Sequence, residues 1–189
     1  MVNAATAVVL GYLIGSIPSA YIIGRSMGKI DMRGEGDGRI SASAVHKRLG
    51  VVPFVLVVIM DVGEGASAVL IAQLLTDSLI VVLIAGFMAV VGHNWSVFLK
   101  FKGGLGATTM YGALVALAWW QVLLAAAIAF ALFLIIRKSG LSTAVLIIIV
   151  SIILFIQKSP LILVVYPFIL ILLMVLKRFQ ISRAVPAKS

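Results

Sequence analysis

The chain has 189 residues, of which 63% are hydrophobic and 11% charged, and its formal net charge is +9. Soluble domains carry about 25% charged residues, so this composition excludes an ordinary soluble domain and indicates a single-domain integral membrane protein. Because it has no cysteine, the chain can form neither a disulfide nor a thiolate metal site. The basic residues lie between apolar runs, so we interpret them as topological signals and as attraction for anionic lipid or substrate, and we expect no nucleic-acid partner.

Seven apolar segments are candidates for membrane helices. They are expected at Val2–Ile23, Val51–Leu75, Leu79–Leu99, Ala107–Ala118, Trp119–Ile136, Leu141–Ile156 and Pro160–Leu176. The first is interrupted by Gly11, Gly15, Ser16 and Pro18. A full span needs about 20 apolar residues, but shorter helices are tolerated when they are buried in protein or line a cavity. We therefore expect one all-α membrane domain over residues 1–189, a seven-transmembrane helix bundle.

The distribution of basic residues supports this count. With seven spans, every lysine and arginine except Lys158 falls on one side of the membrane. The positive-inside rule makes that side the cytoplasm, so the N-terminus is expected outside and the C-terminus inside the cell. Three loops then face the cytoplasm, at about residues 24–50, 100–106 and 137–140. If the fourth and fifth segments were one span, the later basic loops would fall on the opposite side of the membrane from the earlier ones. We therefore keep the two segments separate.

The first of these loops is long and polar. Residues 24–50 contain the run Gly-Glu-Gly-Asp-Gly-Arg at positions 34–39, which suits tight turns with several residues at positive φ. We expect a folded loop that lies over the mouth of the bundle. The alternative is a solvated linker.

The second loop combines positive charge with backbone freedom. The stretch Phe98–Thr109 contains two lysines and then three glycines, Lys100, Lys102, Gly103, Gly104 and Gly106. Glycines let backbone N–H groups approach a ligand, and a helix starting near Ala107 would add its positive end. This predicts a cradle for an anion or phosphate. The alternative is a flexible cytoplasmic loop whose lysines only set the orientation.

Two acids lie within the second apolar segment. Asp61 and Glu64 are three residues apart and share a helix face. If the helix begins near the interface at Val51, Asp61 lies about 15 Å deep, so it should face a polar cavity or a partner. Intramembrane acids indicate a functional site, although one or both could instead pair with a basic loop residue and hold the bundle together. His93, near the end of the third segment, is by itself more typical of a hydrogen-bonded structural residue, and no metal-ligand spacing is present.

Several stretches match a known pattern. Gly92-His93, Val97-Phe98 and the run from Phe101-Lys102-Gly103-Gly104 to Gly106-Ala107-Thr108 resemble Gly-His-x-x-Pro-Val-Phe-x-x-Phe-Lys-Gly-Gly-Lys-Gly-Val-Ala-Thr. Residues 12–18 resemble an opening Tyr-Leu-Leu-Gly-Ser-Ile-Pro, and Asp61 with Gly65 resembles Asp-x-x-Lys-Gly. These are the patterns of the bacterial acyl-phosphate:glycerol-3-phosphate acyltransferases of the PlsY type. The likeness covers nearly the whole chain.

The resemblance implies transfer of a fatty acyl group from acyl phosphate to the 1-hydroxyl of glycerol 3-phosphate, a step that forms lysophosphatidic acid in phospholipid synthesis. It implies no cofactor and no metal, a location in the bacterial plasma (inner) membrane, a site on the cytoplasmic face and contact with membrane lipid. The catalytic positions it implies are Ser41, Ser43, Asp61 and His93. The phosphate-binding positions it implies are Arg39, Lys47, Lys102, Gly103, Gly104, Gly106, Thr108 and Thr143.

The chain departs from the family pattern where the chemistry is expected. Asp37, Arg39 and Ala44 stand where the pattern has serine, asparagine and asparagine, and Glu64 and Leu105 stand where it has lysines. Together these changes remove positive charge from a site that should bind two phosphates. Two alternatives to the family reaction therefore stay open: an acyltransferase-like paralogue with a different acceptor, and a non-catalytic membrane protein that binds lipid phosphate.

Overall fold

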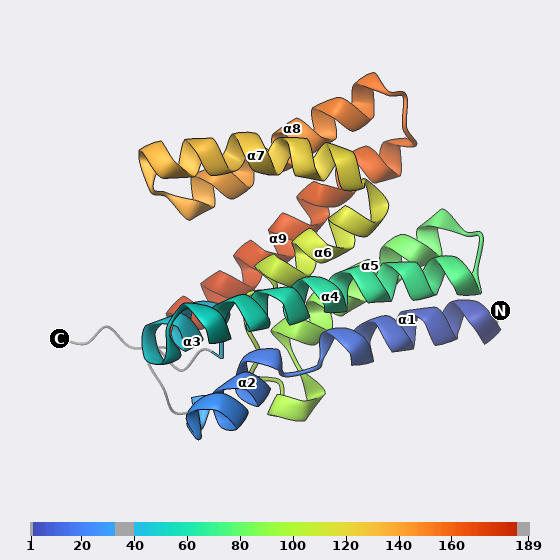
Figure 1. Ribbon diagram of the computed structural model, residues 1–189. Coiled ribbons are helices and arrows are strands. Elements are labelled where there is room, and N and C mark those ends of the chain that lie inside the picture. The colour runs from blue at the N-terminus through green and yellow to red at the C-terminus, as the bar shows by residue number, and fades with distance from the viewer. Residues whose placement is uncertain (1, 33–39, 185–189) are drawn as a thin grey trace.

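The computed structural model describes residues 2–32 and 40–184, and every regular element within them is a helix (Figure 1). The helices are α1 (Val2–Gly15), α2 (Ser19–Gly28), α3 (Ala42–Leu49), α4 (Val51–Leu75), α5 (Leu79–Asn94), α6 (Ala107–Leu117), α7 (Trp119–Ile136), α8 (Ser139–Ile156) and α9 (Leu161–Ala184), and the 3₁₀ turn η2 (Val97–Leu99) follows α5. The described residues include five candidate membrane spans and two shorter apolar helices, Ala107–Leu117 and Gly140–Ile156. The all-α membrane prediction is therefore confirmed.

Several predicted boundaries are confirmed and others are wrong. Ala118, with φ −151°, separates α6 from α7, as expected from the charge alternation. The predicted loop over residues 24–50 is wrong in part, because α2 continues to Gly28 and α3 forms within it. The α3 helix can begin there because the Ser41 hydroxyl accepts the Ala44 N–H at 3.3 Å, which caps its first turn.

Small residues let α1 and α5 approach closely. A Cβ atom on Gly11 would lie 2.4 Å from the Ala85 carbonyl oxygen, and one on Gly15 would lie 2.0 Å from that of Ala89. Both pairs repeat every four residues, which is the spacing that brings two helix backbones together in a membrane. The prediction that Gly11 and Gly15 interrupt the first segment is therefore wrong, because both glycines stay helical and serve packing. The interruption lies at residues 16–18, between α1 and α2.

The α4 and α6 helices make a second close contact. A Cβ atom on Gly65 of α4 would lie 1.9 Å from the Thr109 carbonyl oxygen, and one on Gly112 of α6 would lie 2.0 Å from the Val62 carbonyl oxygen. Because glycines face the partner backbone on both helices, α6 is held directly against the α4 segment that carries the two acids.

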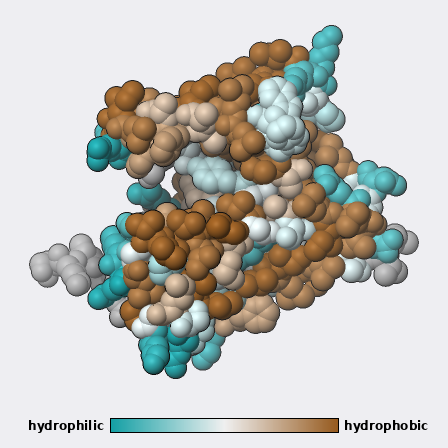
Figure 2. Space-filling view, in the orientation of Figure 1, coloured by the Kyte–Doolittle hydropathy of each residue, from teal (hydrophilic) through white to brown (hydrophobic). Residues whose placement is uncertain are grey.

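The bundle has two distinct ends. Figure 1 shows α3, the α7–α8 turn and the last turns of α9 at one end, and the start of α1 and the α4–α5 turn at the other. In Figure 2, hydrophobic residues dominate the surface between these ends, and hydrophilic residues gather near them. This distribution suits a bundle whose middle lies in the apolar part of a bilayer.

Replacing Gly65 by alanine is expected to destabilise the protein by about 1–3 kcal/mol, because the new methyl group overpacks the α4–α6 contact. Gly63, on the same helix, is the matched control, since a Cβ there meets nothing within 4 Å. Thermal unfolding in detergent should show a lower midpoint for Gly65→Ala and an unchanged or slightly higher midpoint for Gly63→Ala. Equal midpoints for the two variants would contradict the close contact.

Candidate functional site

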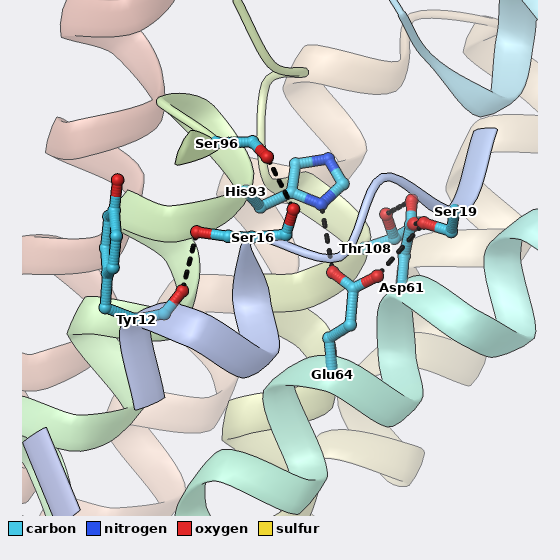
Figure 3. Close-up of polar contacts among 8 residues, drawn as sticks. All are labelled: Tyr12, Ser16, Ser19, Asp61, Glu64, His93, Ser96 and Thr108. Atoms are coloured by element: carbon cyan, nitrogen blue, oxygen red, sulfur yellow. Dashed lines mark hydrogen bonds and ion pairs between the residues drawn. The ribbon is translucent and has the colours of Figure 1, made fainter. Parts of the chain in front are cut away.

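The break between α1 and α2 is tied to the turn that follows α5. The Tyr12 hydroxyl donates to the Trp95 carbonyl at 2.8 Å, and the Ser96 hydroxyl donates to the Ser16 carbonyl. The Ser16 hydroxyl in turn donates to the Tyr12 carbonyl at 2.7 Å. Figure 3 shows Tyr12, Ser16 and Ser96 beside Asp61, Glu64 and His93. These contacts fix the start of α2, where Ser19 is 1% exposed.

Two buried carboxylates form the centre of the site. Asp61 and Glu64 are 3% and 4% exposed, and both lie on the inner face of α4, as their spacing predicted. The Ser19 hydroxyl lies against Asp61 and also 3.0 Å from Glu64 Oε1 (Figure 3). The Thr108 hydroxyl, in the first turn of α6, donates to Asp61 Oδ2 at 2.7 Å. Two other helices, α2 and α6, therefore supply hydroxyls that hold these acids.

His93 completes the cluster from α5. Its Nδ1 lies 3.2 Å from Glu64 Oε2. Asp61, Glu64 and His93 each offer one atom that could ligate a cation, and these atoms lie within 4.8 Å of one another. Spacing along the sequence did not indicate such a group, because His93 comes from a different helix. Among the described residues, the two acids contact hydroxyls and an imidazole, and neither forms an ion pair with a lysine or arginine.

A cavity of about 470 Å³ opens beside the cluster. Its walls are Ser41, Ala42, Ser43, Ala44, Lys47, Arg48, Phe54, Val58, Asp61, His93, Leu105, Gly106, Ala107 and Thr108. The first turns of α3 and α6 both reach this cavity, and helix N-termini attract anions through their unpaired N–H groups. Lys47 and Arg48 add positive charge at the rim. The part of the lining formed by α3 and the start of α6 is thus electropositive, and the lining also includes the buried carboxylate of Asp61.

The cavity brings together most of the residues predicted from sequence. Seven of them line it: Ser41, Ser43, Lys47, Asp61, His93, Gly106 and Thr108. Lys102 is exposed and lies outside this lining. Thr143 also lies outside it, and its hydroxyl contacts the Tyr111 hydroxyl at 2.6 Å. Arg39 and Asp37 lie outside the described residues.

The glycine-rich loop is folded back onto the end of α5. The Gly103 N–H donates to the Asn94 carbonyl at 3.2 Å, and the Gly104 N–H donates to the His93 carbonyl at 3.1 Å. The expectation that these two amides point at a phosphate is therefore wrong in this structure, since both are used to cap α5. Gly106 differs, because it takes a left-handed conformation, with φ 72°, and precedes α6 at the cavity wall.

Sequence reasoning missed Ser19, Arg48 and the pairing of Glu64 with His93. Ser19 carries a weak signal, because it starts a helix directly after Pro18. Its contact with two acids more than 40 positions away depends on the path of the chain between α1 and α2.

The fold and the site define a membrane-embedded helical protein with a polar, anion-attracting cavity at one end of the bundle. Residues 5–186 match the family model described as glycerol-3-phosphate acyltransferase, and the chain belongs to this family. It is 46% identical to glycerol-3-phosphate acyltransferase 2 of Moorella thermoacetica over 112 residues, and 37% identical to the glycerol-3-phosphate acyltransferase of Shouchella clausii over 131 residues. These matches cover 59% and 68% of this chain but only 57% and 64% of the relatives' lengths.

The similarity to solved structures covers more of the chain than the sequence matches do. The chain is similar to PlsY (YgiH), an integral membrane glycerol 3-phosphate acyltransferase, in its glycerol 3-phosphate form, with a TM-score of 0.82 and 28% identity. This match covers 98% of this chain and 94% of that one. The lysophosphatidic acid form gives a TM-score of 0.81 at the same identity and covers 98% and 93% of the two chains.

Removing the Ser19 hydroxyl is expected to destabilise the protein by about 1–3 kcal/mol, because two buried carboxylates lose a hydrogen-bond donor. Ser26, on the same helix, is the matched control, since its hydroxyl is exposed and donates to the Ile23 carbonyl of its own helix. Unfolding of Ser19→Ala and Ser26→Ala in detergent measures the difference. A Ser19→Ala midpoint equal to that of the unaltered protein would show that the acids do not depend on this hydroxyl.

Proposed function

We propose that this chain is a membrane acyltransferase that moves a fatty acyl group from acyl phosphate to the 1-hydroxyl of glycerol 3-phosphate and forms lysophosphatidic acid. The observation that carries the proposal is the cavity, which combines two helix N-termini, basic side chains and hydroxyls with a buried acid. Family membership supports it, as does the likeness to a protein whose structures are described as glycerol 3-phosphate and lysophosphatidic acid forms.

The proposed phosphate contacts come from the electropositive wall. Lys47 provides charge, and the first turns of α3 and α6 provide N–H groups and the hydroxyls of Ser41, Ser43 and Thr108. Gly106 takes the left-handed conformation that precedes α6, and a Cβ there would lie 2.4 Å from Asn94 Oδ1. Lys102, Arg39 and Thr143 remain proposed ligands of the second phosphate, on the strength of the resemblance alone. Asp61 and His93 would face the reacting hydroxyl.

The proposed acyl chain reaches the cavity from the bilayer. Phe54, Val58 and Leu105 form an apolar part of the cavity wall. Neighbouring residues of α4, including Val55 at 43% and Ile59 at 61% exposure, face outward. Figure 2 shows the surface hollowed between the α7–α8 pair and α4, with less hydrophobic residues at the base of the hollow. An acyl phosphate could therefore keep its tail among the helices while its phosphate meets the polar wall.

We further propose that all seven apolar segments cross the membrane, with the N-terminus outside and the cavity facing the cytoplasm of a bacterial plasma membrane. The basic residues support this orientation. Lys47 and Arg48 of α3, and Arg137 and Lys138 of the α7–α8 turn, belong to the end of the bundle that holds the cavity (Figure 1).

A second candidate keeps the acyl donor but changes the acceptor. Leu105 lines the cavity and gives it an apolar wall. The family pattern quoted above has lysine at this position and at Glu64. An acceptor with less negative charge than glycerol 3-phosphate would suit this altered wall better.

Substituting Lys47 by alanine is expected to raise the KM for phosphorylated substrate by about 10-fold or more, because a charged contact to phosphate is worth about 1.5–3 kcal/mol. The assay is lysophosphatidic acid formation by purified protein from acyl phosphate and glycerol 3-phosphate. Lys158→Ala, in the turn at the opposite end of the bundle, is the control and should leave the KM unchanged. Absence of product from the unaltered protein with every acceptor would refute the enzymatic proposal.

Replacing Leu105 by lysine is expected to raise kcat/KM for glycerol 3-phosphate by about 10-fold, since it adds a cation to the cavity wall. Leu105→Met is the matched control, because it changes shape without charge. Both variants should be compared on glycerol 3-phosphate and on uncharged glycerol, where no gain is expected. An equal change on the two acceptors would mean that Leu105 does not face the acceptor phosphate.

A further inference from the structure

A second hollow, a groove of about 410 Å³, lies on the surface between α2 and the η2 turn. Its lining residues are Pro18, Tyr21, Ile22, Phe98 and Leu99, and none of them lines the cavity described above. Phe98 is 59% exposed and Ile22 is 40% exposed, so the groove presents apolar side chains to its surroundings. Figure 1 shows α2 on the opposite side of the bundle from the α7–α8 pair.

The side of α2 that lines the groove continues into basic residues. Arg25 follows Ile22 by three positions, which places both side chains on one side of the helix. Lys29 comes directly after the helix ends and takes a left-handed conformation, with φ 53°. Both basic side chains are exposed. Apolar surface is therefore followed by positive charge along this wall of the groove.

The opposite wall has the same order of side chains. Phe98 and Leu99 are followed by Lys100, which is exposed and left-handed, with φ 52°. Phe101 is also left-handed, with φ 64°, and it is 60% exposed. A bulky residue rarely adopts a positive φ, and here the Phe101 N–H donates to the Ser96 carbonyl at 2.8 Å. The turn thus holds two phenyl rings and a cation at the surface.

An apolar groove that ends in positive charge is complementary to a phospholipid with an anionic headgroup. An acyl tail fits the apolar walls, and each lysine or arginine near an anionic lipid adds attraction. Within residues 2–32 and 40–184, Arg25, Lys29 and Lys100 form no ion pair with an acid. A zwitterionic headgroup offers these cations no net charge, and an inorganic anion has no apolar part to fill the groove.

We propose that the groove between α2 and the η2 turn binds one anionic phospholipid of the surrounding leaflet, with its phosphate at Arg25, Lys29 and Lys100. This lipid is separate from the proposed acyl donor and acceptor, which occupy the cavity. It bridges two segments that the hydrogen bond from Ser96 to the Ser16 carbonyl already joins. Because it binds the folded protein, it raises the stability of the bundle.

The test titrates phosphatidylglycerol into the full-length protein in detergent and measures bound lipid by native mass spectrometry. Phosphatidylcholine with the same acyl chains should bind about 10-fold or more weakly, because it lacks net charge. Arg25→Gln/Lys29→Gln should weaken phosphatidylglycerol binding by about 30-fold and hardly change phosphatidylcholine binding. Phe98→Ala should weaken the binding of both lipids by about 5-fold, because it removes apolar contact with the tail.

Arg137→Gln/Lys138→Gln is the matched control, because it removes two positive charges from the α7–α8 turn at the same end of the bundle. Equal affinity for the two lipids, or an equal loss of phosphatidylglycerol in this control, would overturn the proposal. Release of the lipid by Lys47→Ala would also overturn it, since the lipid would then occupy the cavity. Displacement by excess inorganic phosphate would do the same, since the tail would then contribute nothing.

Thermal unfolding gives an independent measurement on the same samples. Without added lipid, Arg25→Gln/Lys29→Gln should unfold at the midpoint of the unaltered protein, because both side chains are exposed. Added phosphatidylglycerol should raise the midpoint of the unaltered protein and of the Arg137→Gln/Lys138→Gln control. The same rise in Arg25→Gln/Lys29→Gln would contradict the site.

Discussion

The structure depends on one constraint, the burial of two carboxylates within an apolar helix. An ionised acid inside a bilayer costs several kcal/mol unless other groups hydrogen-bond to it. Here the compensating groups come from three other helices: Ser19 begins α2, Thr108 opens α6 and His93 lies near the end of α5. The break between α1 and α2 places Ser19 against the two acids, and the start of α6 at Ala107 places Thr108 against Asp61. Both features therefore help to compensate the buried carboxylates.

Close backbone contacts make that arrangement rigid. The glycine contacts of α1 with α5 and of α4 with α6 leave little room for the helices to slide. The glycine-rich loop adds to this rigidity, because its amides cap α5 next to His93. A catalytic constellation must be held within fractions of an ångström, and packing of this kind can hold it.

The apolar helices, the position of Asp61 beside a polar cavity and the shared face of Asp61 and Glu64 could be predicted from the sequence, because hydropathy, charge alternation and helical periodicity are local signals. The sequence also predicted the start of α6 at Ala107 and the boundary at Ala118. It could not reveal the Glu64–His93 contact, or the inward use of the Gly103 and Gly104 amides, since both depend on how distant helices meet. The α3 helix was missed because it is short and rich in polar residues. Its first turn is capped by a single serine, Ser41.

The contact between α1 and α5 has a consequence for biosynthesis. Gly11 meets Ala85, so the first helix leaves the ribosome more than 70 residues before its permanent neighbour. During that interval α1 resides in the lipid without its partner, which its apolar sequence allows. The polar centre is complete only when α6 has also been made and supplies Thr108, and a nascent chain that ends before α5 holds its two acids without their imidazole neighbour.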